Sequence, residues 1–215
     1  MKEYKLVIFD WDGTLMDSVD RIVSSMQSAA KAVGLAVPSN NATKEIIGLS
    51  LPIAVEKLFS GITSEQIDAM VLEYKYQYIE VDKTESPLFA NALNLLTKMK
   101  QNDKLLAVAT GKGRDGLNRV LNISETEAFF HTTRCAGEMP SKPNPQMLHS
   151  ILEELAIAPH EAIMIGDTSH DLEMAQNAGI ASIGVTFGVH KREVLEKYQP
   201  KAIVNSLIEL QTLLV

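Results

Sequence analysis

Five short, continuous apolar runs constrain the fold of this chain more than any other feature of its sequence. They lie at residues 5–10, 105–110, 162–167, 181–186 and 201–204. None of them alternates apolar and polar residues, which is typical of strands buried on both faces of a parallel sheet. Helical spacing of apolar residues follows several of the runs, as at residues 88–99 and 147–155. The alternation predicts an α/β fold with a parallel sheet and right-handed crossovers.

Residues 17–85 interrupt this alternation, because they contain no convincing strand. Apolar residues at helical spacing predict an amphipathic helix over residues 22–33, with Ser18 as its N-cap, and another over residues 67–78. We therefore expect two domains. Residues 1–16 and 86–215 would form an α/β core domain, and residues 17–85 a helical cap domain inserted after the first strand.

Charge and composition limit the partners of the chain. Its 20 Lys and Arg residues against 27 Asp and Glu residues give a net charge of −7, which argues against a nucleic-acid binder. Cys135 is the only cysteine, so no internal disulfide and no cysteine zinc site can form. No apolar run approaches the roughly 20 residues of a membrane span, and the N-terminal segment is too acidic for a signal peptide. We expect a soluble cytoplasmic protein without a membrane partner; the oligomeric state is not predicted.

Two carboxylates, Asp10 and Asp12, follow the first predicted strand and precede a glycine. Ligands of open α/β sheets bind beyond the carboxyl ends of the strands. Two acids so close together need a cation or hydrogen bonds to be ionised together. Aspartate can also attack phosphorus and form an aspartyl-phosphate. Taken alone, the same residues are more typical of a solvated turn.

Two further segments could bind a phosphate. The hydroxyl of Thr110 and the backbone amide of Gly111 lie at a predicted strand-to-helix turn, where such groups can hold a phosphate, although Thr110 could simply be an N-cap. Lys142 lies between Ser141 and Pro143 at the entrance of a predicted helix, where the macrodipole favours anions. It is either solvated or adjacent to an anion or to carboxylates.

Asp167 and Asp171 form the last candidate pair. They are spaced by four residues, so Asp171 would lie one helical turn beyond Asp167. Oxygen ligands of this kind suit Mg²⁺, and helix capping explains the pair equally well.

Together and in this order, the four segments resemble the motifs of the haloacid dehalogenase-like (HAD) superfamily. FDWDGTLMDS matches D-x-D-G-T, VATGK is similar to the second motif, SKPNP supplies a third-motif lysine, and GDTSHD matches G-D-x-x-x-D. The resemblance covers essentially the whole chain. It is closest to the phosphoglycolate phosphatase and β-phosphoglucomutase subgroup, which carries a helical cap at the place of residues 17–85. It implies a Rossmann-like parallel sheet core with an inserted α-helical cap domain.

The resemblance also implies roles for the candidate residues. Asp10 would be the nucleophile and Asp12 the general acid and base. Mg²⁺ would be held by Asp10, the backbone carbonyl of Asp12 and Asp167, with Asp171 acting through water or through other ligands. The phosphoryl oxygens would be bound by Thr110, Gly111 and Lys142. The cap loop at residues 48–52 resembles the substrate-facing loop of the family, although it could be a simple helix connection.

The expected activity is that of a Mg²⁺-dependent phosphatase, a phosphoric monoester hydrolase acting on a small phosphorylated metabolite of phosphoglycolate type or a related one. A sugar phosphomutase uses the same motifs and withholds water from the aspartyl-phosphate. A phospho-accepting signalling module is disfavoured by the cap and by Asp167 and Asp171. We expect His170 to face solvent, and Cys135 to be a small buried residue.

Overall fold

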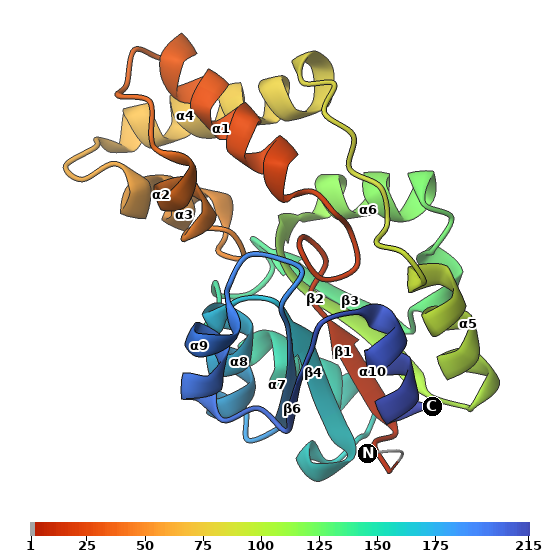
Figure 1. Cartoon of the computed structure of the whole chain (residues 1–215). Coiled ribbons are helices and arrows are strands. Elements are labelled where there is room, and N and C mark those ends of the chain that lie inside the picture. Colours follow the sequence, from red (N-terminus) through yellow and green to blue (C-terminus); the bar gives the residue numbers. More distant parts are fainter. Residues whose placement is uncertain (1–2) are drawn as a thin grey trace.

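A computed structural model, which describes residues 3–215, contains a six-stranded parallel sheet (Figure 1). The strand order is β3-β2-β1-β4-β5-β6. The strands are β1 (Leu6–Phe9), β2 (Leu105–Gly113), β3 (Thr132–Ala136), β4 (Ala162–Gly166), β5 (Ala181–Val185) and β6 (Ala202–Val204). The predicted α/β fold with a Rossmann-like parallel sheet is confirmed, and β1 lies in the middle between β2 and β4.

Helices cover both faces of the sheet. On one face lie α5 (Ala92–Gln101), α6 (Arg114–Ile123) and α10 (Leu207–Leu214), whose apolar residues share one core with Val7 and Phe9 of β1. On the other lie α7 (Gln146–Glu154) and α8 (Ser169–Asn177), packed against Leu6 and Ile8, with α9 (Arg192–Leu195) beside α8. Successive strand residues point to opposite faces, so an apolar run without alternation is what two covered faces require. Short 3₁₀ turns complete this part of the chain: η2 (Glu127–Phe129), η3 (Pro159–Glu161) and η4 (Glu196–Tyr198).

One strand, β3, is missing from the sequence-based prediction. It forms an edge of the sheet and pairs only with β2. Its sequence, TTRCA, is largely polar, and only its first and fourth residues are buried. An edge strand of this kind carries no continuous apolar run, so the pattern used for the other five strands does not detect it.

The segment between β1 and α5 is helical, as predicted, and lies beyond the carboxyl ends of the strands (Figure 1). We call its five elements the cap helices: α1 (Val19–Ala32), α2 (Asn40–Lys44), α3 (Leu51–Leu58), α4 (Ser64–Tyr76) and the π-helix η1 (Gln77–Val81). α1, α3 and α4 share a small apolar core that includes Met26, Val55 and Met70. A capping box between Thr63 and Gln66 begins α4.

Two linkers connect the cap helices with the sheet and run side by side. Met16 forms an antiparallel bridge with Leu88. The amide of Asp17 donates to the carbonyl of Pro87 at 2.8 Å, and the amide of Phe89 donates to the carbonyl of Leu15 at 2.9 Å. The linkers therefore form a short hydrogen-bonded ribbon.

The return linker is also tied to α1. The guanidinium of Arg21 donates hydrogen bonds to the carbonyls of Tyr78, Asp82 and Thr84. The carboxylate of Asp82 accepts hydrogen bonds from the hydroxyls of Ser24 and Ser25. Over residues 3–215, no helix has the length and apolarity needed to cross a membrane.

Candidate active site

The carboxyl ends of three adjacent strands bring the predicted residues together. Asp10 directly follows β1, Thr110 lies in β2, and Asp167 directly follows β4. Two groups join them from the loops and helices: Lys142 from the loop before α7, and Asp171 from the first turn of α8. All five side chains are buried. The shared edge of a parallel sheet thus concentrates groups that are far apart in sequence.

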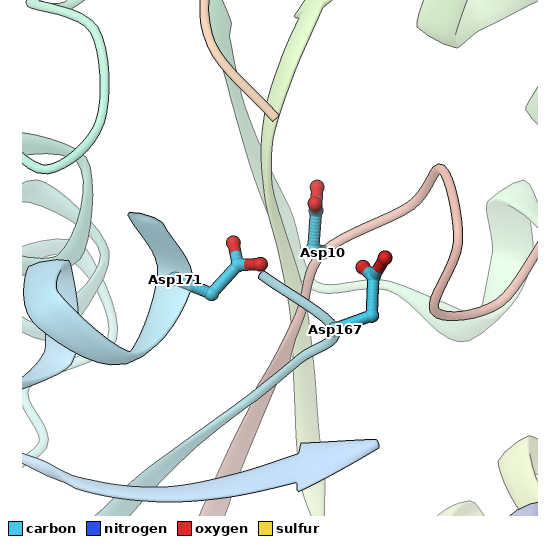
Figure 2. A group of neighbouring side chains, drawn as sticks. All are labelled: Asp10, Asp167 and Asp171. Carbon is cyan, nitrogen blue, oxygen red and sulfur yellow. The ribbon is translucent and has the colours of Figure 1, made fainter. Parts of the chain in front are cut away.

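Asp10, Asp167 and Asp171 form an acidic cluster whose carboxylate oxygens come within 4.8 Å of one another. Figure 2 shows the three side chains converging from the end of β1, the end of β4 and the start of α8. Among residues 3–215, one cation contacts the cluster: Nζ of Lys142 lies 2.9 Å from Oδ1 of Asp10 and 2.6 Å from Oδ1 of Asp171. When all three acids are ionised, two negative charges remain uncompensated.

Asp10 differs from its neighbours in having unengaged oxygens. Oδ1 of Asp167 accepts from the Thr14 hydroxyl at 2.8 Å, and Oδ2 accepts from the amide of Val189 at 2.9 Å. Oδ2 of Asp171 accepts from the amide and the hydroxyl of Thr168, at 3.1 and 2.7 Å. Within residues 3–215, neither oxygen of Asp10 has a hydrogen bond of good geometry, and its contact with Lys142 is ionic. Asp10 is therefore the carboxylate most available to a ligand or a substrate.

Burial and mutual repulsion raise the pKa values of the cluster. Burial raises the pKa of Asp10 to about 7, against the opposing attraction of Lys142. Burial also raises the pKa of Asp167 well above its ordinary range, with added repulsion from Asp171 and Asp10. Burial by itself lowers the pKa of Lys142, but the two aspartates outweigh it and the net pKa is raised. The cluster therefore holds protons near neutral pH unless a further cation compensates its charge.

The cluster fits a hard divalent cation. Its donors are all carboxylate oxygens, which Mg²⁺ prefers, and the two excess charges equal those of one such ion. The unpartnered oxygen of Asp10 gives a direct ligand position. One oxygen of Asp171 is already paired with the ammonium group of Lys142, and the other accepts two hydrogen bonds from Thr168. Each oxygen of Asp167 accepts only one hydrogen bond, from an uncharged group. Asp171 is therefore better placed to hold Lys142 than to bind an ion.

The side chain of Asp12 has different partners from the acidic cluster. Its Oδ1 accepts a 2.6 Å hydrogen bond from the hydroxyl of Ser18, and its Oδ2 lies 3.1 Å from Nζ of Lys112. Sequence reasoning missed both contacts, although both residues lie in the quoted motif segments. Ser18 is the N-cap residue of α1, as predicted, but its side chain makes no capping hydrogen bond to the helix. The hydroxyl reaches back to Asp12 instead.

The predicted cap loop at residues 48–52 lies directly over the second phosphate-binding candidate. A side-chain Cβ placed at Gly111 would be 2.4 Å from the carbonyl oxygen of Gly48 and 2.5 Å from that of Leu49. The amide of Ser50 donates a 2.9 Å hydrogen bond to the hydroxyl of Ser141, next to Lys142. The loop is thus held against the sheet edge from two sides.

A cavity of about 640 Å³ lies between the cap helices and the sheet edge. Asp10, Asp12 and Thr110 line it on the sheet side, and the wall from the cap helices is largely apolar. A cavity of this size accommodates a small organic molecule. The carboxylates of Asp10 and Asp12 thus line a cavity to which the cap helices contribute one wall.

The expectation that His170 faces solvent is wrong. The side chain is only 9% exposed, and its Nε2 lies 3.3 Å from the carbonyl oxygen of Glu45 in the cap helices. Burial lowers its pKa. The prediction for Cys135 is confirmed, since that residue is fully buried.

Comparison with known proteins agrees with this geometry. A family model described as haloacid dehalogenase-like hydrolase matches residues 7–185. The chain is 32% identical to "Probable phosphatase IndB" of Dickeya dadantii, covering 95% of this chain and 91% of the relative. It is 29% identical to the phosphoglycolate phosphatase of Vibrio vulnificus, covering 97% and 95%. A solved haloacid dehalogenase-like family hydrolase from Streptococcus pneumoniae superposes with a TM-score of 0.86 at 25% identity, covering 99% of each chain.

Proposed function

Since the chain belongs to the haloacid dehalogenase-like hydrolase family and is a phosphatase of that family, we propose that it hydrolyses a small phosphate monoester, of phosphoglycolate type or related, in a Mg²⁺-dependent reaction. The observation that carries this proposal is the buried carboxylate of Asp10. It lies against Lys142, has no hydrogen-bond partner over residues 3–215 and faces the cavity. Residues 1–16 and 86–215 would be the catalytic core domain and residues 17–85 the cap domain.

In the first step an oxygen of Asp10 attacks phosphorus, and the bond between phosphorus and the leaving oxygen breaks. Asp12 donates a proton to that oxygen, which leaves an aspartyl-phosphate on Asp10. In the second step Asp12 takes a proton from a water molecule that attacks the same phosphorus. Inorganic phosphate and free Asp10 result. Ser18 and Lys112 hold the Asp12 carboxylate in one orientation through both steps.

The remaining residues neutralise charge. The Thr110 hydroxyl, the Gly111 amide and Lys142 would bind the phosphoryl oxygens. The metal would be held by Asp10, Asp167 and the backbone carbonyl of Asp12, and when bound it would compensate the negative charge of carboxylates and phosphate. Asp171 orients Lys142 through a 2.6 Å contact. The cap helices would exclude bulk water during transfer.

The test is phosphate release from a panel of small phosphate esters, with excess Mg²⁺ and with EDTA. We compare the wild type with Asp10→Asn and with Asp20→Asn, an exposed aspartate in the first turn of α1. The wild type and Asp20→Asn should release phosphate only with Mg²⁺, and Asp10→Asn should be inactive. Asp10→Asn should fold with at least the wild-type melting temperature in EDTA, because it removes a buried charge from an acidic cluster.

Two results would contradict the proposal. Turnover retained in Asp10→Asn would exclude Asp10 as the nucleophile. Formation of an isomerised sugar phosphate that requires an activating bisphosphate, without release of phosphate, would identify a phosphomutase instead.

A further inference from the structure

Three polar groups that line the cavity lie close to one another. They are Lys112 at the end of β2, Arg119 on α6 and Tyr78 on η1 of the cap helices. Nζ of Lys112 lies 5.0 Å from the centroid of the Tyr78 ring, and Cζ of Arg119 lies 5.8 Å from it. The guanidinium of Arg21 lies 4.8 Å from the same centroid, but it is held by backbone carbonyls of the return linker. Of the three cations near this ring, Lys112 and Arg119 line the cavity.

Two of these groups have buried atoms without a partner. The hydroxyl of Tyr78 and Nε of Arg119 are buried and make no hydrogen bond over residues 3–215. The Tyr78 side chain belongs to a residue that is only 6% exposed. Buried donors are almost always paired in native proteins, and leaving one unpaired is costly. Two such donors in one cavity wall indicate a ligand that accepts from both.

The charge of Arg119 is also uncompensated. Over the described residues it makes no ion pair, whereas Lys112 pairs with Asp12. Arg114 lines the same cavity, but its guanidinium is held by Glu138 and by Thr133. Arg119 is therefore the guanidinium at this cavity that is free to pair with an anion.

We propose that Arg119, the Tyr78 hydroxyl and Lys112 bind a second oxyanion, carried by the leaving group of the substrate. The position supports a leaving-group site because Lys112 contacts both the Tyr78 ring and Asp12, the residue proposed to protonate the leaving oxygen. The inference rests on the proposed function and narrows it to phosphate monoesters with an anionic leaving group. The oxyanion is a carboxylate or a second phosphoryl group, since both offer acceptors to a guanidinium fork.

The subsite contains groups from both parts of the chain. Arg119 and Lys112 follow β2, and Tyr78 belongs to the cap helices. The anionic group would therefore be recognised only when the cap helices lie over the sheet edge. This couples recognition of the leaving group to closure of the site.

Non-hydrolysable phosphonates test the subsite without turnover. We compare 3-phosphonopropionate and ethane-1,2-diphosphonate, which end in a carboxylate and in a phosphoryl group, with propylphosphonate, whose end is neutral. Binding is measured by calorimetry in excess Mg²⁺. The wild type should bind at least one anionic phosphonate about 10- to 100-fold more tightly than propylphosphonate, as expected for hydrogen bonds to a charged group. The anionic phosphonate that binds more tightly shows whether the oxyanion is a carboxylate or a phosphoryl group.

Variants test which residues cause the preference for anionic phosphonates. Arg119→Gln should abolish this preference and leave the affinity for propylphosphonate within about threefold of the wild-type value. Tyr78→Phe, which removes the hydroxyl and keeps the ring, should reduce the preference. Arg114→Gln is the matched control and should retain the preference, because that guanidinium is already engaged. If Arg119→Gln fails to fold, Tyr78→Phe and Arg119→Lys carry the test, the latter retaining part of the preference.

The inference is overturned if the wild type binds all three phosphonates equally or binds none, or if Arg119→Gln keeps the preference. Failure of the proposed function is seen separately, as absence of phosphate release from every ester in the panel. An enzyme that hydrolyses neutral esters as well as anionic ones would keep the proposed function and lose this inference.

Discussion

The hydroxyl of Ser18 donates a 2.6 Å hydrogen bond to Oδ1 of Asp12, between the residue that precedes α1 and the loop that follows β1. Both side chains are buried. The bond fixes one oxygen of Asp12 and leaves Lys112 on the other. Ser18 therefore links the orientation of the proposed general acid to the start of the cap helices.

Removing this hydroxyl should slow the reaction without unfolding the protein. Loss of a hydrogen bond to a charged group changes an equilibrium or a rate by about 10- to 100-fold. Ser18→Ala should therefore lower kcat by about 10- to 100-fold. Steady-state kinetics on the preferred ester measures it. Ser24→Ala is the control, since that hydroxyl lies on the same helix and contacts Asp82 instead. Equal kcat values for Ser18→Ala and the wild type would show that Asp12 does not depend on this bond.

Replacing Lys142 should destabilise the protein. Its ammonium group is fully buried and is the one cation in contact with the acidic cluster among the described residues. Removing one partner of a buried ion pair costs about 3–5 kcal/mol, so Lys142→Met should lower the free energy of unfolding by that amount near pH 8. Urea unfolding in EDTA measures it. Lys5→Met is the control, because Lys5 forms an exposed pair with Glu161 and should cause little change. A stable Lys142→Met variant would contradict the assigned electrostatics.

A methyl group at Gly111 should disturb the contact between the cap loop and the sheet edge. The added Cβ would lie 2.4 Å from the carbonyl oxygen of Gly48, so the loop must move away. Gly111→Ala should lower kcat/KM by about 10- to 100-fold, the order expected from a displacement of about 1 Å at a reacting centre. Gly113→Ala is a matched control two residues on, where an added Cβ meets nothing within 4 Å. Similar losses in both variants would show that the loop contact is not the cause.

Metal binding should depend on pH with a definite sign. The pKa of Asp10 is raised to about 7 by burial, and that of Asp167 is also raised, so the metal-free cluster holds protons below neutral pH. Mg²⁺ must displace these protons. Its affinity should therefore fall as the pH is lowered from about 8 to about 6, with proton release upon binding. Calorimetry in buffers of different ionisation enthalpy measures both quantities. An affinity that is constant over this range would contradict the raised pKa values.

The same pKa shift predicts how the metal affects stability. Between the unfolded-state pKa of aspartate, about 3.9, and about 7, the folded metal-free protein holds a proton at Asp10 that the unfolded chain has lost. The contribution of Asp10 to stability therefore declines as the pH rises through this window. Added Mg²⁺ should raise the melting temperature more near pH 8 than near pH 5.5, as thermal scans with Mg²⁺ and with EDTA would show. An equal increase at both pH values would contradict this linkage.

Most of the fold could be predicted because five of the six strands coincide with continuous apolar runs. These are the interior strands β1, β2, β4 and β5, which are covered on both faces, and the edge strand β6. Their order along the chain predicts which strand ends share an edge. β3 could not be found in this way, since Thr132 to Arg134 are polar and the strand lies at the edge. Its place depends on pairing with β2, a contact that is not encoded in its own periodicity.

The candidate site was predictable to the extent that it depends on strand ends. Asp10, Thr110 and Asp167 meet because three neighbouring parallel strands end there. The partners of Asp12 were not predictable, because the local preference of serine for helix N-caps favoured another role for Ser18. His170 was misjudged because it is buried and contacts the carbonyl of Glu45, in a part of the chain whose position over the sheet no local pattern specifies.

The paired linkers determine how the two parts of the molecule can move relative to each other. The bridge between Met16 and Leu88, with the flanking backbone hydrogen bonds, joins the outgoing and returning chains into one strip. A pair of hydrogen-bonded strands bends readily out of its own plane, but it resists shear and twisting within that plane. The cap helices should therefore swing along a single arc and return to the same registration. Tyr78 would then reach Arg119 at the same time as the loop at Gly48 reaches Gly111. One motion would therefore both close the cavity and complete the proposed leaving-group site.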